Sequence, residues 1–226
     1  MRNGYLGLGL VLLILGLFLS PRLAFWVTLG IPVSFLGALL LMPIFDVSIN
    51  IISLFAFIVT LGLVVDDAIV VGESIQYERE HGVPRRVAAA RGARLVSVPV
   101  VLAVATTCVA FAPMLFVPGP AGELFRNIPL VVILVLCCSL IESLLVVPAH
   151  LAHPMPRALA FFVRPFFWAM ERLGSDAVTR GLGRFVQRVY VPAARRALAW
   201  RYLTVALAIA VLLGGLGLWL GARIHL

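Results

Sequence analysis

Lysine is absent from this 226-residue sequence, and acidic residues are few. The positive charge comes from 18 arginines against ten aspartates and glutamates, which gives a formal net charge of +8. Only 12% of the residues are charged, whereas 62% are apolar, and the mean hydropathy is +1.10. So little charge excludes a soluble globular domain. We therefore expect a membrane protein, in which the positive balance does not indicate nucleic acid as a partner.

Cysteine is scarce as well. Cys108, Cys137 and Cys138 all fall inside apolar runs, and an odd number of buried thiols predicts neither a disulfide framework nor a metal site. His150 and His153 have a spacing that suits a metal on a helix, but two ligands are weak evidence, and we interpret them as residues at a membrane interface. The sequence predicts no metal, no cofactor and no enzymatic reaction.

Long apolar runs are abundant. A helix of about 20 residues crosses the roughly 30 Å hydrocarbon layer of a membrane, and six runs approach or reach that length. They cover residues 5–19, 23–45, 49–71, 95–117, 128–149 and 202–221. The first run resembles the apolar part of a secretory signal peptide, but no small-x-small cleavage site follows it, so we expect an uncleaved span.

These runs predict an all-α fold, a polytopic membrane helix bundle with six transmembrane helices. We expect residues 1–153 to form a bundle of five spans, 154–201 a cytoplasmic-interface linker and 202–226 the sixth span. The first, third and fifth connections between the runs hold 15 arginines, and the second and fourth hold one. The positive-inside rule then predicts that the odd connections lie in the cytoplasm and both termini on the outer side.

Two of the connections have features of helices. Gly82 suits the end of a helix that continues beyond Val71, and Pro84 suits the first turn of a helix that leads back into the membrane. In the linker, Arg180, Arg184 and Arg188 recur every four residues, while apolar residues occupy another face. This pattern predicts an amphipathic helix in the membrane interface, with a soluble helical hairpin as the alternative.

Two adjacent carboxylates, Asp66 and Asp67, interrupt the third run in the stretch GLVVDDAIVVGES. Each aspartate near the centre of a membrane helix costs roughly 2.5 to 3.5 kcal/mol on insertion scales. The leucines, isoleucines, valines and phenylalanines of the run lower the insertion free energy by about 5 to 9 kcal/mol in all. The favourable and unfavourable contributions to insertion therefore nearly cancel. The helix should be stable mainly where its polar face meets other helices or water. Gly62, Ala68 and Gly72 are the small residues that would let neighbouring helices approach.

Four interpretations account for the pair. The acids reach the cytoplasmic interface and are structural, or they belong to an intramembrane aspartyl protease, which takes one aspartate from each of two helices. In the third interpretation the acids form the acidic ring of a channel, and in the fourth they bind and release an ion or a proton. Adjacent carboxylates titrate as a coupled unit, and no lysine or arginine lies between Leu23 and Glu78. These facts favour a proton relay.

Glu142, in the fifth run, is the other intramembrane acid, and two interpretations stand for it. It is an auxiliary proton site, or it forms a structural hydrogen bond with a neighbouring serine or a backbone carbonyl.

The run INIISLFAFIVTLGLVVDDAIVVGESI, residues 49–75, resembles the fourth transmembrane helix of the resistance-nodulation-division efflux permeases. Further stretches resemble neighbouring helices of that family: LFLSPRLAFWVTLGIPVSFLGA, HGVPRRVAAARGAR, VPVVLAVATTCVAFAPMLFVPG and LIESLLVVPAHLAH. In the drug and amphiphile exporters of the family, paired aspartates in G-x-x-x-D-D-A-I-V-V carry the proton relay. The resemblance therefore implies this role for Asp66 and Asp67.

The resemblance also implies where and how the protein works. The chain would belong to a multi-pass transporter of the bacterial inner membrane that is driven by the proton-motive force, with the proton as coupling ion. Family permeases are homotrimers that work with a periplasmic adaptor and an outer-membrane channel. This chain corresponds to their helices two to seven, and their relay lysine belongs to the other half. We therefore expect a fragment that is inactive without the remaining half of the permease. The alternative is a non-transporting, membrane-embedded interaction fragment that packs against that half.

Overall fold

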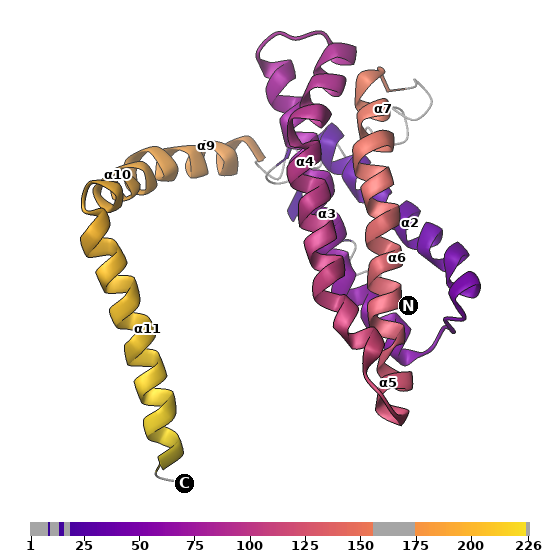
Figure 1. The fold of residues 1–226 in the computed structure, drawn as a ribbon. Helices are drawn as coiled ribbons and strands as arrows, with labels where there is room; N and C mark the ends of the chain where they lie inside the picture. Colours follow the sequence, from indigo (N-terminus) through magenta and orange to yellow (C-terminus); the bar gives the residue numbers. More distant parts are fainter. Residues whose placement is uncertain (1–8, 10–13, 16–18, 156–174, 225–226) are drawn as a thin grey trace. The chain divides into compact units, whose positions relative to one another are not determined.

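All the regular structure in the described part of the chain is helical. The computed structural model describes residues 9, 14–15, 19–155 and 175–224 (Figure 1). Five of its helices are long and apolar enough to cross a membrane, which confirms the all-α membrane bundle. The predicted first span, residues 5–19, lies mostly outside the described residues.

The chain divides into two compact units, Met1–Leu173 and Gly174–Leu226. In the first unit the membrane-spanning elements are α2 (Pro21–Leu41) with the 3₁₀ turn η1 (Met42–Phe45), α3 (Ile51–Glu80), α4 (Arg85–Phe111) with the 3₁₀ turn η2 (Ala112–Phe116), and α6 (Asn127–Ile141) with the π-turn η3 (Glu142–Val146) and α7 (Val147–Ala152). A short helix, α5 (Pro120–Phe125), joins η2 to α6.

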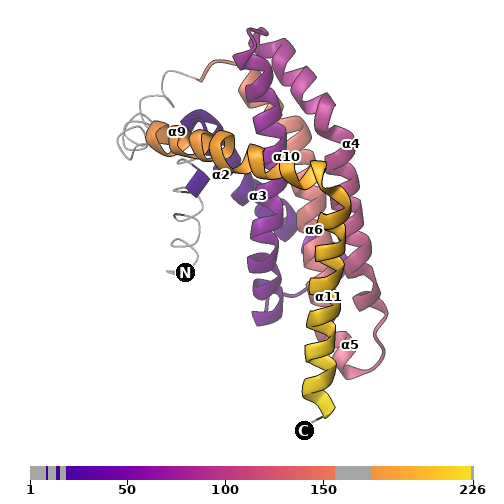
Figure 2. The ribbon, with the colours of Figure 1, turned by 90° about the vertical axis from the view of Figure 1, so that its left-hand side faces the viewer.

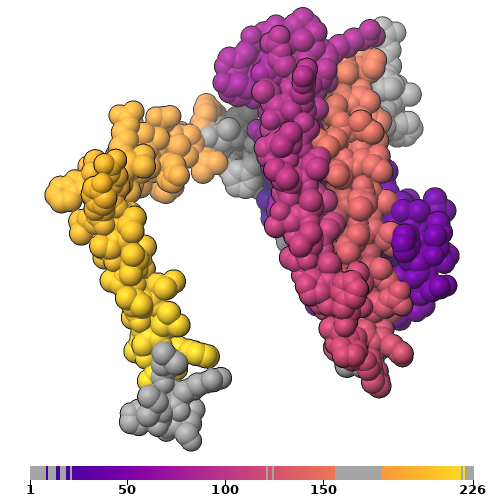
Figure 3. All heavy atoms as spheres, in the orientation of Figure 1, coloured from indigo at the N-terminus to yellow at the C-terminus, as the bar shows by residue number. Residues whose placement is uncertain are grey.

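The pair α3 and α6 forms the centre of this unit. Each of the two packs against the other and against both α2 and α4. The α2 and α4 helices therefore lie on opposite sides of the central pair. The space-filling view shows α4 and α6 in contact along their length (Figure 3). Valines dominate the interior, and Val27, Val71, Val131, Val132 and Val135 have no accessible surface.

The ends of α3 are set by local hydrogen bonds. At its start, Asn50 Oδ1 accepts from the backbone N–H groups of Ile52 and Ser53, each at 2.9 Å, and Ser53 Oγ accepts from the Asn50 N–H at 2.8 Å. This capping box satisfies donors that the first helical turn leaves free. At its end, Gly82 has a φ of +83°, a left-handed conformation that favours glycine. The predicted helix end at Gly82 and the return helix after Pro84 are both confirmed.

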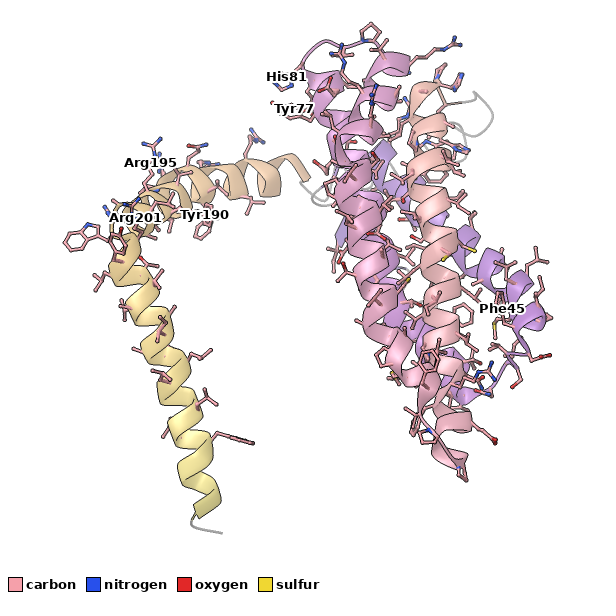
Figure 4. All side chains as sticks on the ribbon, in the orientation of Figure 1. Phe45, Tyr77, His81, Tyr190, Arg195 and Arg201 are labelled. Carbon is pink, nitrogen blue, oxygen red and sulfur yellow. The ribbon has the colours of Figure 1, made fainter. Side chains whose placement is uncertain are left out.

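The α3 and α4 helices form a tight hairpin beyond this loop. Ser74 Oγ donates to the Gly92 carbonyl at 3.0 Å, and Glu78 forms an ion pair with Arg91 at 3.7 Å. A Cβ on Gly92 would lie 2.6 Å from the Cα of Ile75, so the two backbones touch. Near the loop, the rings of Tyr77 and His81 pack with their centroids 4.2 Å apart (Figure 4). These contacts fix the position of α3 along the axis of α4.

Two π-turns have the same sequence context. The turn η3 ends where the Val147 N–H donates to the Glu142 carbonyl, five residues back, and Pro148 follows. The turn η4 (Val186–Tyr190) likewise ends at Val191, and Pro192 follows. A proline ring clashes with the carbonyl four residues earlier in an α-helix. A widened turn just before the proline relieves that clash and lets the helix continue.

The α2 helix begins against the end of α7. The Arg22 guanidinium donates to the carbonyls of His150 and His153, where the last carbonyls of α7 lack helical partners. Trp26, one turn later, packs on the His150 ring with centroids 4.1 Å apart. These contacts place the first turn of α2 and the end of α7 at the same end of the unit.

The second unit consists of α9 (Ser175–Phe185), the π-turn η4, α10 (Val191–Ala199) and α11 (Arg201–Ile224). The chain bends at Trp200 between α10 and α11 (Figure 2). Thr204 Oγ1 closes this bend by donating to the carbonyls of Ala197, at 3.0 Å, and Trp200, at 3.2 Å. The predicted linker is helical from residue 175 onward, and its residues 156–174 lie outside the described part.

We expect the α3–α4 hairpin to be sensitive to side-chain volume at Gly92. Because a Cβ there would press on the Ile75 backbone, Gly92→Ala should lower the free energy of unfolding by about 1 to 3 kcal/mol relative to a matched control. The control is Gly62→Ala in α3, where a Cβ meets nothing within 4 Å. Both changes remove one helical glycine, so their helix propensities cancel. Unfolding in mixed detergent micelles measures the difference, and equal stabilities would contradict the expectation.

Candidate functional site

The two aspartates lie about halfway along α3 and occupy different faces. Asp67 is half-buried, and Val64 and Val71, one turn before and one turn after it, are fully buried. Asp66 is exposed within the described unit, as are Val70, one turn later, and Glu73, two turns later. Adjacent helical residues point about 100° apart. The pair therefore places one carboxylate at the edge of the packed face and the other on the open face.

Neither carboxylate is neutralised within the described residues. Asp66 and Asp67 have no hydrogen bond and no ion pair there. Among the described residues, α3 forms an ion pair through Glu78, about three turns farther along the helix. A carboxylate at membrane depth without a cation or donor is costly unless it binds a proton, meets water or is covered by another segment. Chemically, the pair is suited to reversible protonation.

The three small residues of α3 differ in their surroundings. Ala68 is buried, with 2% of its surface accessible. A Cβ on Gly72 would lie 3.1 Å from Leu23 Cδ2, so Gly72 accommodates α2 at close range. Gly62 faces open space within the described unit, and its predicted role in helix packing stays a prediction.

Glu142 is enclosed where the aspartates are not. It is the first residue of the π-turn η3, and only 4% of its surface is accessible. Its carboxylate lies against Gly30 of α2, where a Cβ would be 2.6 Å from Oε2. Within the described residues Oε2 has no hydrogen-bond partner. Neither a backbone carbonyl nor a serine bonds to that oxygen.

Sequence reasoning missed two serines near this carboxylate. Ser34 of α2 and Ser139 of α6 have 1% and 0% of their surface accessible, and neither hydroxyl has a hydrogen-bond partner among the described residues. One signal was available: Gly30, Ser34 and Gly37 recur at helical spacing on one face of α2. Isolated serines in apolar runs are otherwise indistinguishable from ordinary packing residues.

The two histidines bond within their own helix, and the cysteines form no disulfide among the described residues. His150 Nδ1 lies 2.8 Å from the Val146 carbonyl and His153 Nδ1 lies 3.0 Å from the Ala149 carbonyl, four residues back in each case. In the described part of the chain, no three His, Cys, Asp or Glu side chains gather in a way that would hold a metal ion. The three cysteines are free thiols.

Comparison with known proteins gives one family. The family model described as the AcrB/AcrD/AcrF family matches residues 1–221. A multidrug resistance protein MdtC of Yersinia enterocolitica is 36% identical over 187 residues, which are 81% of this chain and 18% of the relative. The protein of the same name from Photorhabdus laumondii is 36% identical over 149 residues, which are 66% of this chain and 14% of the relative. The chain thus spans less than a fifth of the length of these relatives.

An insertion measurement separates a carboxylate at membrane depth from one that reaches the interface. We expect Asp66→Leu to lower the apparent free energy of inserting the Ile51–Glu80 segment by about 3 kcal/mol. Glu80→Leu is the control, because Glu80 ends α3 and is exposed. Its effect should be much smaller. A glycosylation-based insertion assay provides the measurement, and equal effects of the two changes would favour the structural interpretation of Asp66.

Proposed function

The chain belongs to the AcrB/AcrD/AcrF family, the resistance-nodulation-division permeases, and from this premise we propose that Asp66 and Asp67 form the proton relay of a multidrug efflux transporter. The relay takes protons from the outer side of the bacterial inner membrane and releases them to the cytoplasm. Proton flow would drive the export of drugs or amphiphiles. The names of the relatives, multidrug resistance proteins, support the class of substrate.

One observation carries the proposal. Two adjacent carboxylates sit midway along a membrane-spanning helix with no ion pair or hydrogen bond in the described residues. A structural acid would be expected to have a partner or to lie at a helix end. Asp67 at the edge of the packed face and Asp66 on the open face would allow a proton to be held between the bundle and a segment that covers the open face.

The open face of α3 is suited to contact with another segment of the permease. Asp66 and Glu73 lie on it among exposed apolar residues such as Val59 and Val70. We propose that the remaining half of the permease covers this face and supplies the lysine that the family relay implies, since the sequence of this chain has none. In the complete transporter this assembly is a homotrimer, which works with a periplasmic adaptor and an outer-membrane channel. On this proposal the chain alone does not transport.

The test is dye efflux by cells that lack their own pumps and express the chain together with the remaining part of the permease. Asp66→Asn and Asp67→Asn each keep the shape of the side chain but cannot cycle a proton, so efflux should fall to the background level while the protein still inserts. Asp46→Asn is the matched control. Asp46 is exposed, lies before α3 and has a φ of 54°, which asparagine tolerates. Its efflux should be unchanged.

Two results would overturn the proposal. Undiminished efflux in both Asp66→Asn and Asp67→Asn would exclude the relay. Absence of efflux when the unaltered chain and the remaining part of the permease are both present in the membrane would instead support a non-transporting interaction fragment.

A further inference from the structure

A closed polar cluster lies between α2 and the end of α6. It consists of the Glu142 carboxylate and the hydroxyls of Ser34 and Ser139, which are 4%, 1% and 0% accessible. Glu142 Oε2 and both serine oxygens lack hydrogen-bond partners in the described residues. Buried polar atoms are nearly always paired in folded proteins. Three unpaired oxygens along one helix interface therefore call for an explanation.

The contacts of α2 place the three groups together. Gly30 lies against the Glu142 carboxylate, and Gly37 lies against Cys138, where a Cβ would be 3.0 Å from Sγ. Ser34 stands between these two glycines on the same face of α2. Ser139 stands between Cys138 and Glu142 on α6. The two serines therefore lie on neighbouring stretches of α2 and α6, between the levels of the two glycine contacts.

The serines differ from the other hydroxyls of the bundle. Thr28 Oγ1 donates to the Ala24 carbonyl at 2.7 Å, and Thr60 Oγ1 donates to the Ala56 carbonyl at 2.9 Å, each four residues back in its own helix. Ser143, next to Glu142, is fully buried and donates to the Leu140 carbonyl at 3.3 Å. Ser34 and Ser139 make no such bond to their own helices. Their hydroxyls are free to bond across the interface.

We propose that Glu142, Ser34 and Ser139 form a second proton-binding site, separate from Asp66 and Asp67, in which Glu142 is held as the neutral carboxylic acid. A protonated carboxyl offers one O–H donor and one acceptor oxygen, and each serine hydroxyl is both a donor and an acceptor. In this site the carboxyl and serine side chains turn toward one another, so that the acid donates a hydrogen bond to one serine and accepts one from the other. A single proton thereby neutralises the charge, and the rotation pairs the three oxygens that have no partner in the arrangement described above.

A proton fits this site better than a metal ion. Hard cations such as Ca²⁺ or Mg²⁺ take about six or more oxygen ligands, and the cluster contains only one carboxylate and two hydroxyls. An isolated carboxylate in an apolar interior becomes neutral rather than staying charged. Gly30 leaves no room for further ligands on the α2 side, because even a Cβ there would overlap the carboxylate.

The charged and titratable groups around the π-turn do not alter this assignment. The elements that pack against η3 are α2, α3, α6 and α7. On α2, the Arg22 guanidinium is bound to carbonyls of α7, two turns from Gly30. On α7, His150 bonds to the Val146 carbonyl and stacks on Trp26. The titratable groups of α6 are the thiols of Cys137 and Cys138, and those of α3 at membrane depth are Asp66, Asp67 and Glu73, which would add negative charge and so favour the neutral acid.

Infrared spectroscopy of the full chain in lipid membranes tests the site. The C=O stretching band of a protonated carboxylic acid should be present at neutral pH and should be lost in Glu142→Gln. It should persist in an Asp66→Asn, Asp67→Asn double variant, so the result does not depend on the proposed relay. Ser34→Ala and Ser139→Ala should each shift the band to higher frequency, because the acid loses a hydrogen bond. Ser143→Ala, a buried serine that already bonds to its own helix, should leave the band in place.

Two outcomes would overturn this assignment. One is an inserted Glu142→Gln protein that keeps every acid band of the wild type. The other is a band that neither Ser34→Ala nor Ser139→Ala shifts, which decides the question even where Glu142→Gln fails to insert.

Discussion

The first unit depends on how closely α2 approaches α3 and α6. Gly72 of α3 accommodates Leu23, Gly30 accommodates the Glu142 side chain, and Gly37 lies against Cys138. Helices in a membrane gain little from the hydrophobic effect when they associate, so close van der Waals contact at small residues supplies much of the packing energy. Because the same face of α2 holds α6 and its first turn holds α3, these contacts fix how the two central helices sit. The surroundings of Glu142 follow directly from them.

The bundle satisfies most of its polar groups within single helices. Hydroxyls of threonines bond to carbonyls one turn back, as Thr60 does on α3 and Thr106 does on α4, at 2.7 Å from the Leu102 carbonyl. The π-turn before Pro148 keeps the helix continuous where a proline would otherwise kink it. Backbone groups in an apolar medium must be bonded internally. Buried polar atoms that lack a hydrogen bond within their own helix are therefore exceptions, and they mark candidate binding sites.

The sequence predicted the five spans that the described residues contain, and it drew attention to the aspartate pair, because both signals are local. An apolar run of about 20 residues and two adjacent carboxylates are visible without knowing which helices touch, and Gly82 marked the end of α3 through its own backbone requirement. The packed side of each helix was not predictable. Helix α3 is apolar on nearly every side, so no periodicity showed that Val64 and Val71 face the interior while Val70 does not. For the same reason Ser34 and Ser139 could not be paired with Glu142 before the helices were assembled.

The three intramembrane acids differ in access, and the difference bears on what each can do. Asp66 lies on an open face of the described unit, so it can exchange a proton or meet a partner while the bundle keeps its arrangement. Glu142 lies against Gly30 and has only 4% of its surface accessible. On our proposal its proton therefore exchanges more readily from an open arrangement, with α2 and α6 farther apart, than from this closed one. A proton that binds more tightly to the closed arrangement than to the open one stabilises the closed one by that difference. Proton binding at Glu142 is thereby coupled to helix separation, whereas proton binding at Asp66 is coupled to whatever covers its face.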